Sequence, residues 1–193
     1  MNAPNALTLM RVAAVPAIVL LLFARDPIAG IAPAWIAAAL FALAAATDWA
    51  DGWLARRTGA VSAFGRLLDP VADKVLVAGV LVGLVATGVV AGWHVAAAIV
   101  ILGRELLVSG LREYLAQEGG ELPVTRLAKW KTASQLVAIV ALAAAPAAGA
   151  FVAAAGLALL WLSAVLTIVT GWTYLAESLR RVAAEPRPGG ARD

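Results

Sequence analysis

The chain has 193 residues, of which 63% are hydrophobic and only 14% are charged, and its mean hydropathy is +0.90. A soluble domain averages about a quarter charged residues, so this composition excludes a water-soluble globular protein. We assign the formal net charge of +3 to one face of a membrane protein and therefore predict no nucleic-acid partner. The chain has no cysteine, which excludes disulfides and thiolate chemistry. The sequence therefore predicts an all-α integral membrane protein embedded in a lipid bilayer.

About six apolar stretches follow one another, each near the length of about 20 residues with which a helix crosses a bilayer. They are residues 7–23, 31–46, 71–91, 94–110, 136–154 and 156–175. The first has no basic segment before it and no cleavage motif after it, so we expect a retained span. Pro and Gly mark breaks at 25–27, at 88–92 and at Ala145-Pro146. We predict a single transmembrane catalytic domain, residues 1–183, and a disordered cytoplasmic tail, 184–193.

Basic residues fall almost entirely in one set of connections, which predicts the orientation. This set comprises Arg56, Arg57, Arg66, Lys74, Arg112, Arg126, Lys129, Lys131, Arg180, Arg181, Arg187 and Arg192. The opposite set holds only Arg25. By the positive-inside rule the basic face is cytoplasmic, and an even number of spans places both termini on that side as well.

Four aspartates form two stripes at helical spacing. Asp48 and Asp51 share one stripe with Gly52 and Ala55, at i, i+3, i+4 and i+7. Gly65, Asp69 and Asp73 follow at i, i+4 and i+8, after a short turn near 58–62 that makes the two helices antiparallel neighbours. We expect the four carboxylates to converge on one cavity near the cytoplasmic face.

Carboxylates held that close repel one another unless a cation compensates them. Oxygen-only ligands favour Mg²⁺ or Mn²⁺, with Ca²⁺ as a further possibility. The small residues Gly52, Ala55 and Gly65 leave room for a ligand against the backbone, and Arg56 supplies a cation suited to phosphate. Together these features predict a site for a metal-bridged diphosphate. Paired structural charges at helix ends are the alternative, but intramembrane carboxylates are costly and generally functional.

The run 48–73 reads D-x2-D-G-x2-A-R-x8-G-x3-D-x3-D. It resembles the signature of the CDP-alcohol phosphatidyltransferases and matches that signature at every fixed position. Six spans with the motif bridging the second and third are also this family's plan. The segments 4–11, 103–113 and 129–135 are most similar to bacterial members that use glycerol 3-phosphate as the acceptor.

The resemblance implies transfer of a phosphatidyl group from CDP-diacylglycerol to glycerol 3-phosphate, with release of CMP, in a bacterial cytoplasmic (inner) membrane. It implies that Asp48, Asp51, Asp69 and Asp73 hold the metals and that Asp73 is also the general base. The residues that it implies for CDP-diacylglycerol binding are Asn5, Thr8, Gly52, Ala55, Arg56, Ser62 and Gly65. The family's usual assembly is a homodimer.

Glycerol 3-phosphate is a dianion, so its pocket requires fixed positive charge. The candidates for the acceptor phosphate are Arg104, Arg112, Lys129 and Lys131. An arginine placed within a span, as Arg104 is, is expected to face the interior of the bundle. Structural ion pairs of Arg104 with Glu105, or of Arg112 with Glu113, are the alternative.

Two other functions are compatible with these residues. One is the same chemistry with another acceptor, such as inositol phosphate, serine or phosphatidylglycerol; the basic pocket argues against serine. The other is a transporter or channel with an acidic cation site. The chain lacks the interrupted midplane helices and repeat symmetry of many transporters, which favours the enzyme.

Overall fold

The computed structural model describes the backbone of residues 3–58, 63–117 and 125–184, and side chains within these ranges except at 3–7, 48–70, 116–117, 173 and 177–184. This part of the chain is helical, which confirms the predicted fold class. Its elements are α1 (Ala3–Phe23), α2 (Pro33–Thr58), α3 (Ala63–Ala86), the short 3₁₀ helix η1 (Gly92–His94), α4 (Val95–Gln117), α5 (Arg126–Ala148) and α6 (Ala150–Ala184). The predicted tail falls on residues outside this description, apart from Ala184, with which α6 ends.

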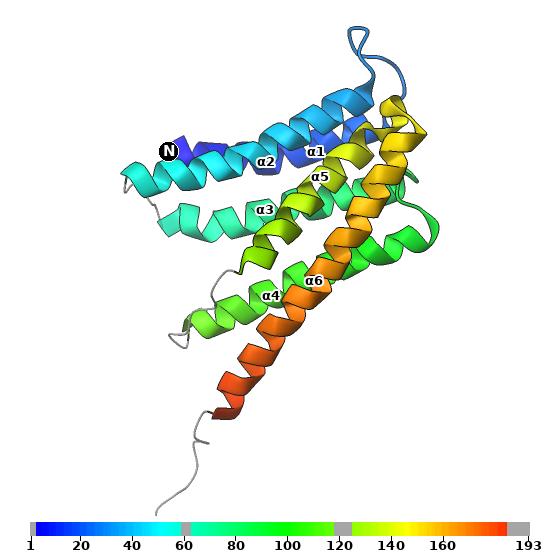
Figure 1. The fold of residues 1–193 in the computed structure, drawn as a ribbon. Coiled ribbons are helices and arrows are strands. Elements are labelled where there is room, and N and C mark those ends of the chain that lie inside the picture. The colour runs from blue at the N-terminus through cyan, green and yellow to red at the C-terminus, as the bar shows by residue number, and fades with distance from the viewer. Residues whose placement is uncertain (1–2, 59–62, 118–124, 185–193) are drawn as a thin grey trace, which may run out of the picture.

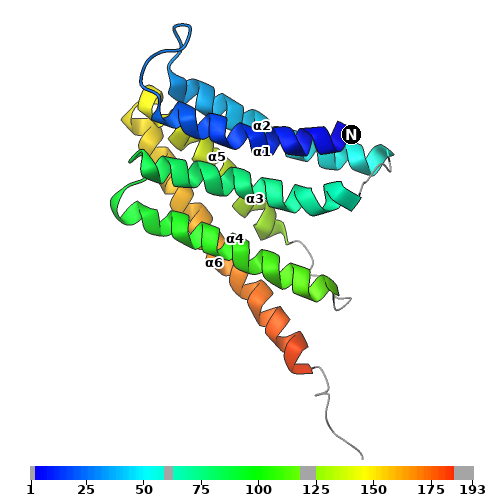
Figure 2. The ribbon, with the colours of Figure 1, turned by 180° about the vertical axis from the view of Figure 1, so that it is seen from behind.

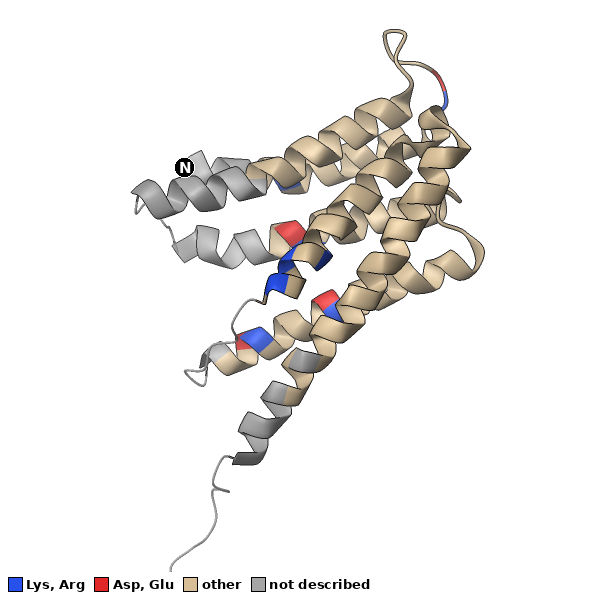
Figure 3. Cartoon of the chain, viewed as in Figure 1, with Lys and Arg blue, Asp and Glu red and all other residues tan. Residues whose placement is uncertain are grey.

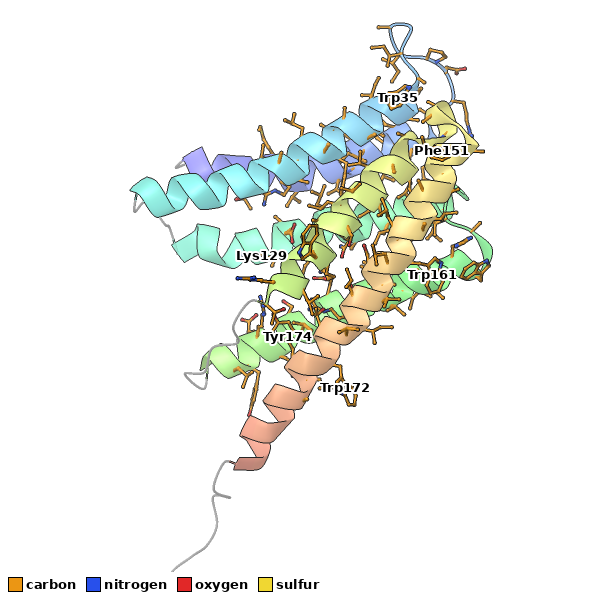
Figure 4. All side chains as sticks on the ribbon, viewed as in Figure 1. Trp35, Lys129, Phe151, Trp161, Trp172 and Tyr174 are labelled. Atoms are coloured by element: carbon orange, nitrogen blue, oxygen red, sulfur yellow. The ribbon has the colours of Figure 1, made fainter. Side chains whose placement is uncertain are left out.

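Apolar helices with lipid-facing side chains make this a membrane protein. Among the described residues, three stretches are long and apolar enough to cross a bilayer, Gly92–Leu115, Arg126–Ala148 and Ala150–Ala176, and two shorter apolar stretches are Thr8–Phe23 and Pro33–Thr47. Large apolar side chains point away from the bundle (Figure 4), among them Phe151 at 86% exposure and Trp172 at 71%. Exposed apolar surface on this scale is unfavourable in water and favourable in lipid.

The helices form one bundle in which neighbours in sequence are not always neighbours in space. α1 packs against both α2 and α3, α5 packs against α2 and α6, and α6 also covers α4. Figures 1 and 2 show α1, α2 and α3 on one side of the molecule and α4 and α6 on the other, with α5 between them. α2 and α3 run in opposite directions, as predicted, yet among the described residues they contact each other little: α3 packs mainly on α1, and α2 packs on both α1 and α5.

The boundary between the last two helices differs from the prediction. The predicted span 136–154 and the break at Ala145-Pro146 are wrong here, because α5 runs from Arg126 to Ala148 and the chain breaks at Gly149. The predicted span 156–175 lies within α6, which begins earlier, at Ala150. Thr125 caps the start of α5 by accepting a hydrogen bond from the Ala128 amide at 3.2 Å. Pro146 fits into the last turn, and Gly149 ends the helix with φ at 93°, which glycine adopts without strain.

Glycine allows a close approach of α3 to α1. A Cβ at Gly79 would overlap the Cγ1 methyl of Val15, and one at Gly83 would lie 3.1 Å from Leu22 Cδ1. This pair therefore packs two helices of one chain, as small residues commonly do in membranes. The similarly spaced Gly88 and Gly92 lie in the connection to α4 with φ at 77° and 58°, where the break at 88–92 was predicted.

We expect Gly79→Ala to lower the stability of the bundle by about 1–3 kcal/mol, because the stiff, β-branched Val15 cannot yield to the new methyl group. Thermal unfolding in detergent micelles measures the effect. The double variant Val15→Ala, Gly79→Ala should recover part of the loss. Gly103→Ala is the matched control, because a Cβ there meets no atom within 4 Å. Equal unfolding temperatures for Gly79→Ala and Gly103→Ala would contradict the close contact.

Candidate active site

Charged side chains gather in one half of the bundle. Figure 3 shows the described Lys, Arg, Asp and Glu residues toward the end where α4 finishes and α5 begins, with a second, much smaller group in the α1–α2 connection. That smaller group is Arg25 and Asp26. As the sequence predicted, most of the described charged residues therefore lie toward one end of the bundle.

The aspartate motif lies on two continuous helices. α2 runs through Asp48 and Asp51, and α3 runs through Asp69 and Asp73, so the helical spacing on which the motif was interpreted holds for the backbone. Asp73 is the one of the four whose side chain the structure describes, and it is partly buried. The side chains of the other three, and those of Asn5, Ala55, Arg56 and Ser62, lie outside the described residues. Of Gly52 and Gly65 the structure describes the helical backbone alone. Thr8 is described and is buried on α1.

Within the described part of the chain, no three His, Cys, Asp or Glu side chains come together as a metal site. Three of the four predicted ligands fall outside that part, so the four-carboxylate site stays a prediction. What the structure does describe is the surrounding of Asp73.

Asp73 opens onto a pocket of about 150 Å³ between α3, α4 and α5. Its polar wall consists of Asp73, Lys74, Glu105, Lys131, Thr132 and Gln135. The remaining wall is apolar, with Val77 and Ala78 on α3, Leu102 and Leu106 on α4 and Leu136 on α5. A mostly apolar lining with a few convergent polar groups is typical of small-molecule sites.

Lys131 is the buried cation of this pocket. The residue is only 4% exposed, and its ammonium group forms an ion pair with the Glu105 carboxylate across the gap between α5 and α4. An ammonium group has three N–H donors, so the contact with Glu105 leaves donors for an anion in the pocket. A buried lysine is retained only where a partner compensates its charge, which Glu105 does in part.

Arg104 lies next to this pair and faces the bundle, as predicted for an intramembrane arginine. Its Nη1 approaches Glu105 Oε1 at 3.4 Å, and its Nη2 donates to Thr170 Oγ1 at 3.2 Å. The side chain passes directly over Gly171, where a Cβ would lie 3.0 Å from Arg104 Cγ. The expected Arg104–Glu105 pair therefore exists, but Glu105 is shared with Lys131.

Arg112 and Lys129 lie farther from the pocket. Arg112 is exposed, donates from Nη2 to the Tyr174 hydroxyl at 3.1 Å, and places its guanidinium 5.1 Å from the centre of that ring. The structure thus pairs Arg112 with Tyr174 of α6, whereas the alternative from the sequence was an ion pair of Arg112 with Glu113. Lys129 is exposed and projects away from α5 (Figure 4). Of the four acceptor candidates, the structure brings Lys131 and Arg104 together through Glu105.

Several residues of the site were not singled out from the sequence. In the sequence, Lys74 bears only on the orientation and Gln135 only on the family resemblance, and no motif marks Thr170 or Tyr174. The i, i+4 spacing of Lys131 and Gln135 was a usable signal, because it places both on one face of a helix. The pairing of Lys131 with Glu105 joins residues 26 positions apart and had no local signal.

Comparison with known proteins identifies the family. A sequence model of the CDP-alcohol phosphatidyltransferases matches residues 1–169. A relative from Pseudomonas fluorescens is 43% identical over 91% of this chain and 89% of its own length. A relative from Rickettsia bellii is 41% identical over 90% and 93%, and one from Bacillus subtilis is 37% identical over 92% and 95%. Each of the three is a CDP-diacylglycerol–glycerol-3-phosphate 3-phosphatidyltransferase. The chain belongs to the CDP-alcohol phosphatidyltransferase family.

Proposed function

We propose that the protein transfers the phosphatidyl group of CDP-diacylglycerol to glycerol 3-phosphate, forming phosphatidylglycerol phosphate and CMP. The observation that carries this proposal is the similarity along nearly the whole chain to relatives of that activity. The geometry supports it, because a carboxylate and a buried cation, Asp73 and Lys131, share one pocket. An acceptor with a hydroxyl at one end and a phosphate at the other has a partner for each.

Asp73 serves as the general base. The acceptor hydroxyl oxygen forms a bond to the phosphorus on the lipid side of the diphosphate, its proton passes to the Asp73 carboxylate, and the bond from phosphorus to the CMP oxygen breaks. A carboxylate within reach of the attacking hydroxyl is the geometric requirement for this role. The place of Asp73 in the wall of the pocket supports this role.

Lys131 and Arg104 supply positive charge for the acceptor phosphate, and Glu105 holds the two cations in place while the pocket is free of substrate. Arg112 and Lys129 belong to the same basic region and attract the dianion from the aqueous phase. Binding by fixed charges fits this class of transfer, which depends on positioning and charge neutralisation more than on covalent chemistry.

Asp48, Asp51, Asp69 and Asp73 are the residues that would hold a divalent metal. Their chemistry fits the group, since four carboxylates on two helices form an oxygen-only donor set of the kind that Mg²⁺ and Mn²⁺ prefer. When bound, the metal neutralises diphosphate charge. Asn5, Thr8, Gly52, Ala55, Arg56, Ser62 and Gly65 would contact the CDP-diacylglycerol around it.

The protein acts in a bacterial cytoplasmic membrane, with the site facing the cytoplasm and two copies forming a homodimer. The orientation follows from the charge asymmetry, because the basic end of a membrane protein remains on the cytoplasmic side. The six helices of the bundle then place both termini in the cytoplasm.

We expect the purified protein to release CMP from CDP-diacylglycerol with Mg²⁺ and glycerol 3-phosphate, and to stop when EDTA removes the metal. CMP and the lipid product are measured together, with inositol 1-phosphate, serine and phosphatidylglycerol offered separately as other acceptors. Excess Mg²⁺ added after EDTA should restore turnover, which controls for inactivation. Turnover with a different acceptor only would keep the family chemistry and reject glycerol 3-phosphate. No CMP with any acceptor would reject the enzyme in favour of cation transport.

A further inference from the structure

Gln135 lines the pocket and carries a hydrogen-bond acceptor that is not used. The residue is 3% exposed, and its amide oxygen Oε1 is buried without a hydrogen-bond partner among the described residues. Most buried side-chain oxygens in proteins have a partner, so a group without one calls for an explanation. A substrate that enters the pocket and brings its own donor provides that explanation.

The position of Gln135 restricts which part of a substrate it meets. Gln135 lies one helical turn beyond Lys131 on the same face of α5, and both line the pocket opposite Asp73 of α3. The neighbouring wall is apolar, formed in part by Leu102 and Leu136. A hydrogen bond in such surroundings has little competition from water, so its loss is costly.

We propose that the Gln135 amide binds the second hydroxyl group of the acceptor, the one that does not attack, and so selects a diol phosphate over a simple alcohol phosphate. This inference rests on the proposed function. In glycerol 3-phosphate, C2 is the middle carbon between the attacking hydroxyl at C1 and the phosphate at C3. With the phosphate at Lys131 and the attacking hydroxyl at Asp73, the C2 hydroxyl therefore lies between these two residues. An amide both donates and accepts, as a hydroxyl does, so rotation about the Cγ–Cδ bond matches the two groups.

Two acceptors that differ by this hydroxyl alone test the proposal: glycerol 3-phosphate and 3-hydroxypropyl phosphate. We expect the wild-type protein to prefer glycerol 3-phosphate by about 10- to 100-fold in kcat/KM, as for the loss of one buried hydrogen bond. Gln135→Met keeps the length and removes the hydrogen-bonding groups. It should reduce the preference to less than about threefold by lowering kcat/KM for glycerol 3-phosphate alone.

Ser134→Ala is the matched control on the same helix. The Ser134 hydroxyl contacts Ser163 Oγ at 2.9 Å and donates to the Lys131 carbonyl, so it faces α6 and does not line the pocket. Its loss should leave the preference between the two acceptors unchanged.

Three results would overturn the inference: equal use of both acceptors by the wild-type protein, an undiminished preference in Gln135→Met, or an equal loss with both acceptors. The first of these needs no variant, so it holds even if Gln135→Met does not fold. Gln135→Asn is a second variant, which keeps the amide group on a shorter side chain. We expect its preference for glycerol 3-phosphate to lie between those of the wild-type protein and Gln135→Met. Failure of the proposed function looks different, because the wild-type protein would then release no CMP with glycerol 3-phosphate.

Discussion

Asp73→Asn is expected to reduce turnover by about 10²- to 10⁴-fold while CDP-diacylglycerol still binds, because an amide of the same shape cannot accept the proton of the attacking hydroxyl. The position of Asp73 in the wall of the pocket allows this separation, since the pocket itself is not filled or emptied by the change. Single-turnover release of CMP measures the chemical step, and equilibrium binding of CDP-diacylglycerol in detergent micelles measures the affinity.

The comparison with Lys74→Met controls for a change of charge in the same wall of the pocket. We expect this neighbour to alter the chemical step far less than Asp73→Asn, because a lysine at this position is not the proton acceptor. A loss of CDP-diacylglycerol binding that fully accounts for the lost turnover in Asp73→Asn would remove Asp73 from the role of general base. Unchanged single-turnover rates would remove it from the chemistry altogether.

Lys131→Met is expected to raise the KM for glycerol 3-phosphate by about 10- to 100-fold, with little change in the KM for CDP-diacylglycerol. The expected size follows from the loss of a charge-assisted hydrogen bond in a buried site, worth about 1.5–3 kcal/mol. Lys129→Met is the matched comparison on the same helix. Because Lys129 is exposed, its charge is screened by solvent, and we expect a change of less than about threefold.

The ion pair with Glu105 offers a sharper test of what Lys131 does. Removal of Lys131 leaves Glu105 with only the longer contact to Arg104 at 3.4 Å, so Lys131→Met should also lower the unfolding temperature. Glu105→Gln is the comparison, because it breaks the same ion pair but keeps the Lys131 ammonium group in the pocket. If the KM for glycerol 3-phosphate rises in Lys131→Met and much less in Glu105→Gln, Lys131 binds the acceptor. An equal rise of the KM in both variants would make the pair structural only.

Local regularities made much of this protein predictable. A composition with 14% charged residues and repeated apolar stretches predicts membrane helices, because in lipid the backbone N–H and C=O groups can form hydrogen bonds only with one another. The aspartate motif depends on spacings of three and four residues within a helix, so it could be interpreted before any helix was placed in space. The same motif was sufficient to identify the family, which the comparison with known proteins confirmed.

Contacts between helices were decided only by the tertiary structure. Periodicity shows which residues share a face but not which neighbour that face meets, so the sequence placed Lys129 and Lys131 together, whereas the fold exposes one and buries the other. The start of α5 was missed because its first turns are too polar to count as part of a span. Glu105, 26 residues before Lys131, becomes its partner because α4 and α5 meet at the pocket. The sequence by itself determined the helices, the carboxylate stripes and the family; the packing of α3, α4 and α5 decided the shape and charge of the pocket, because those depend on contacts between residues far apart in the chain.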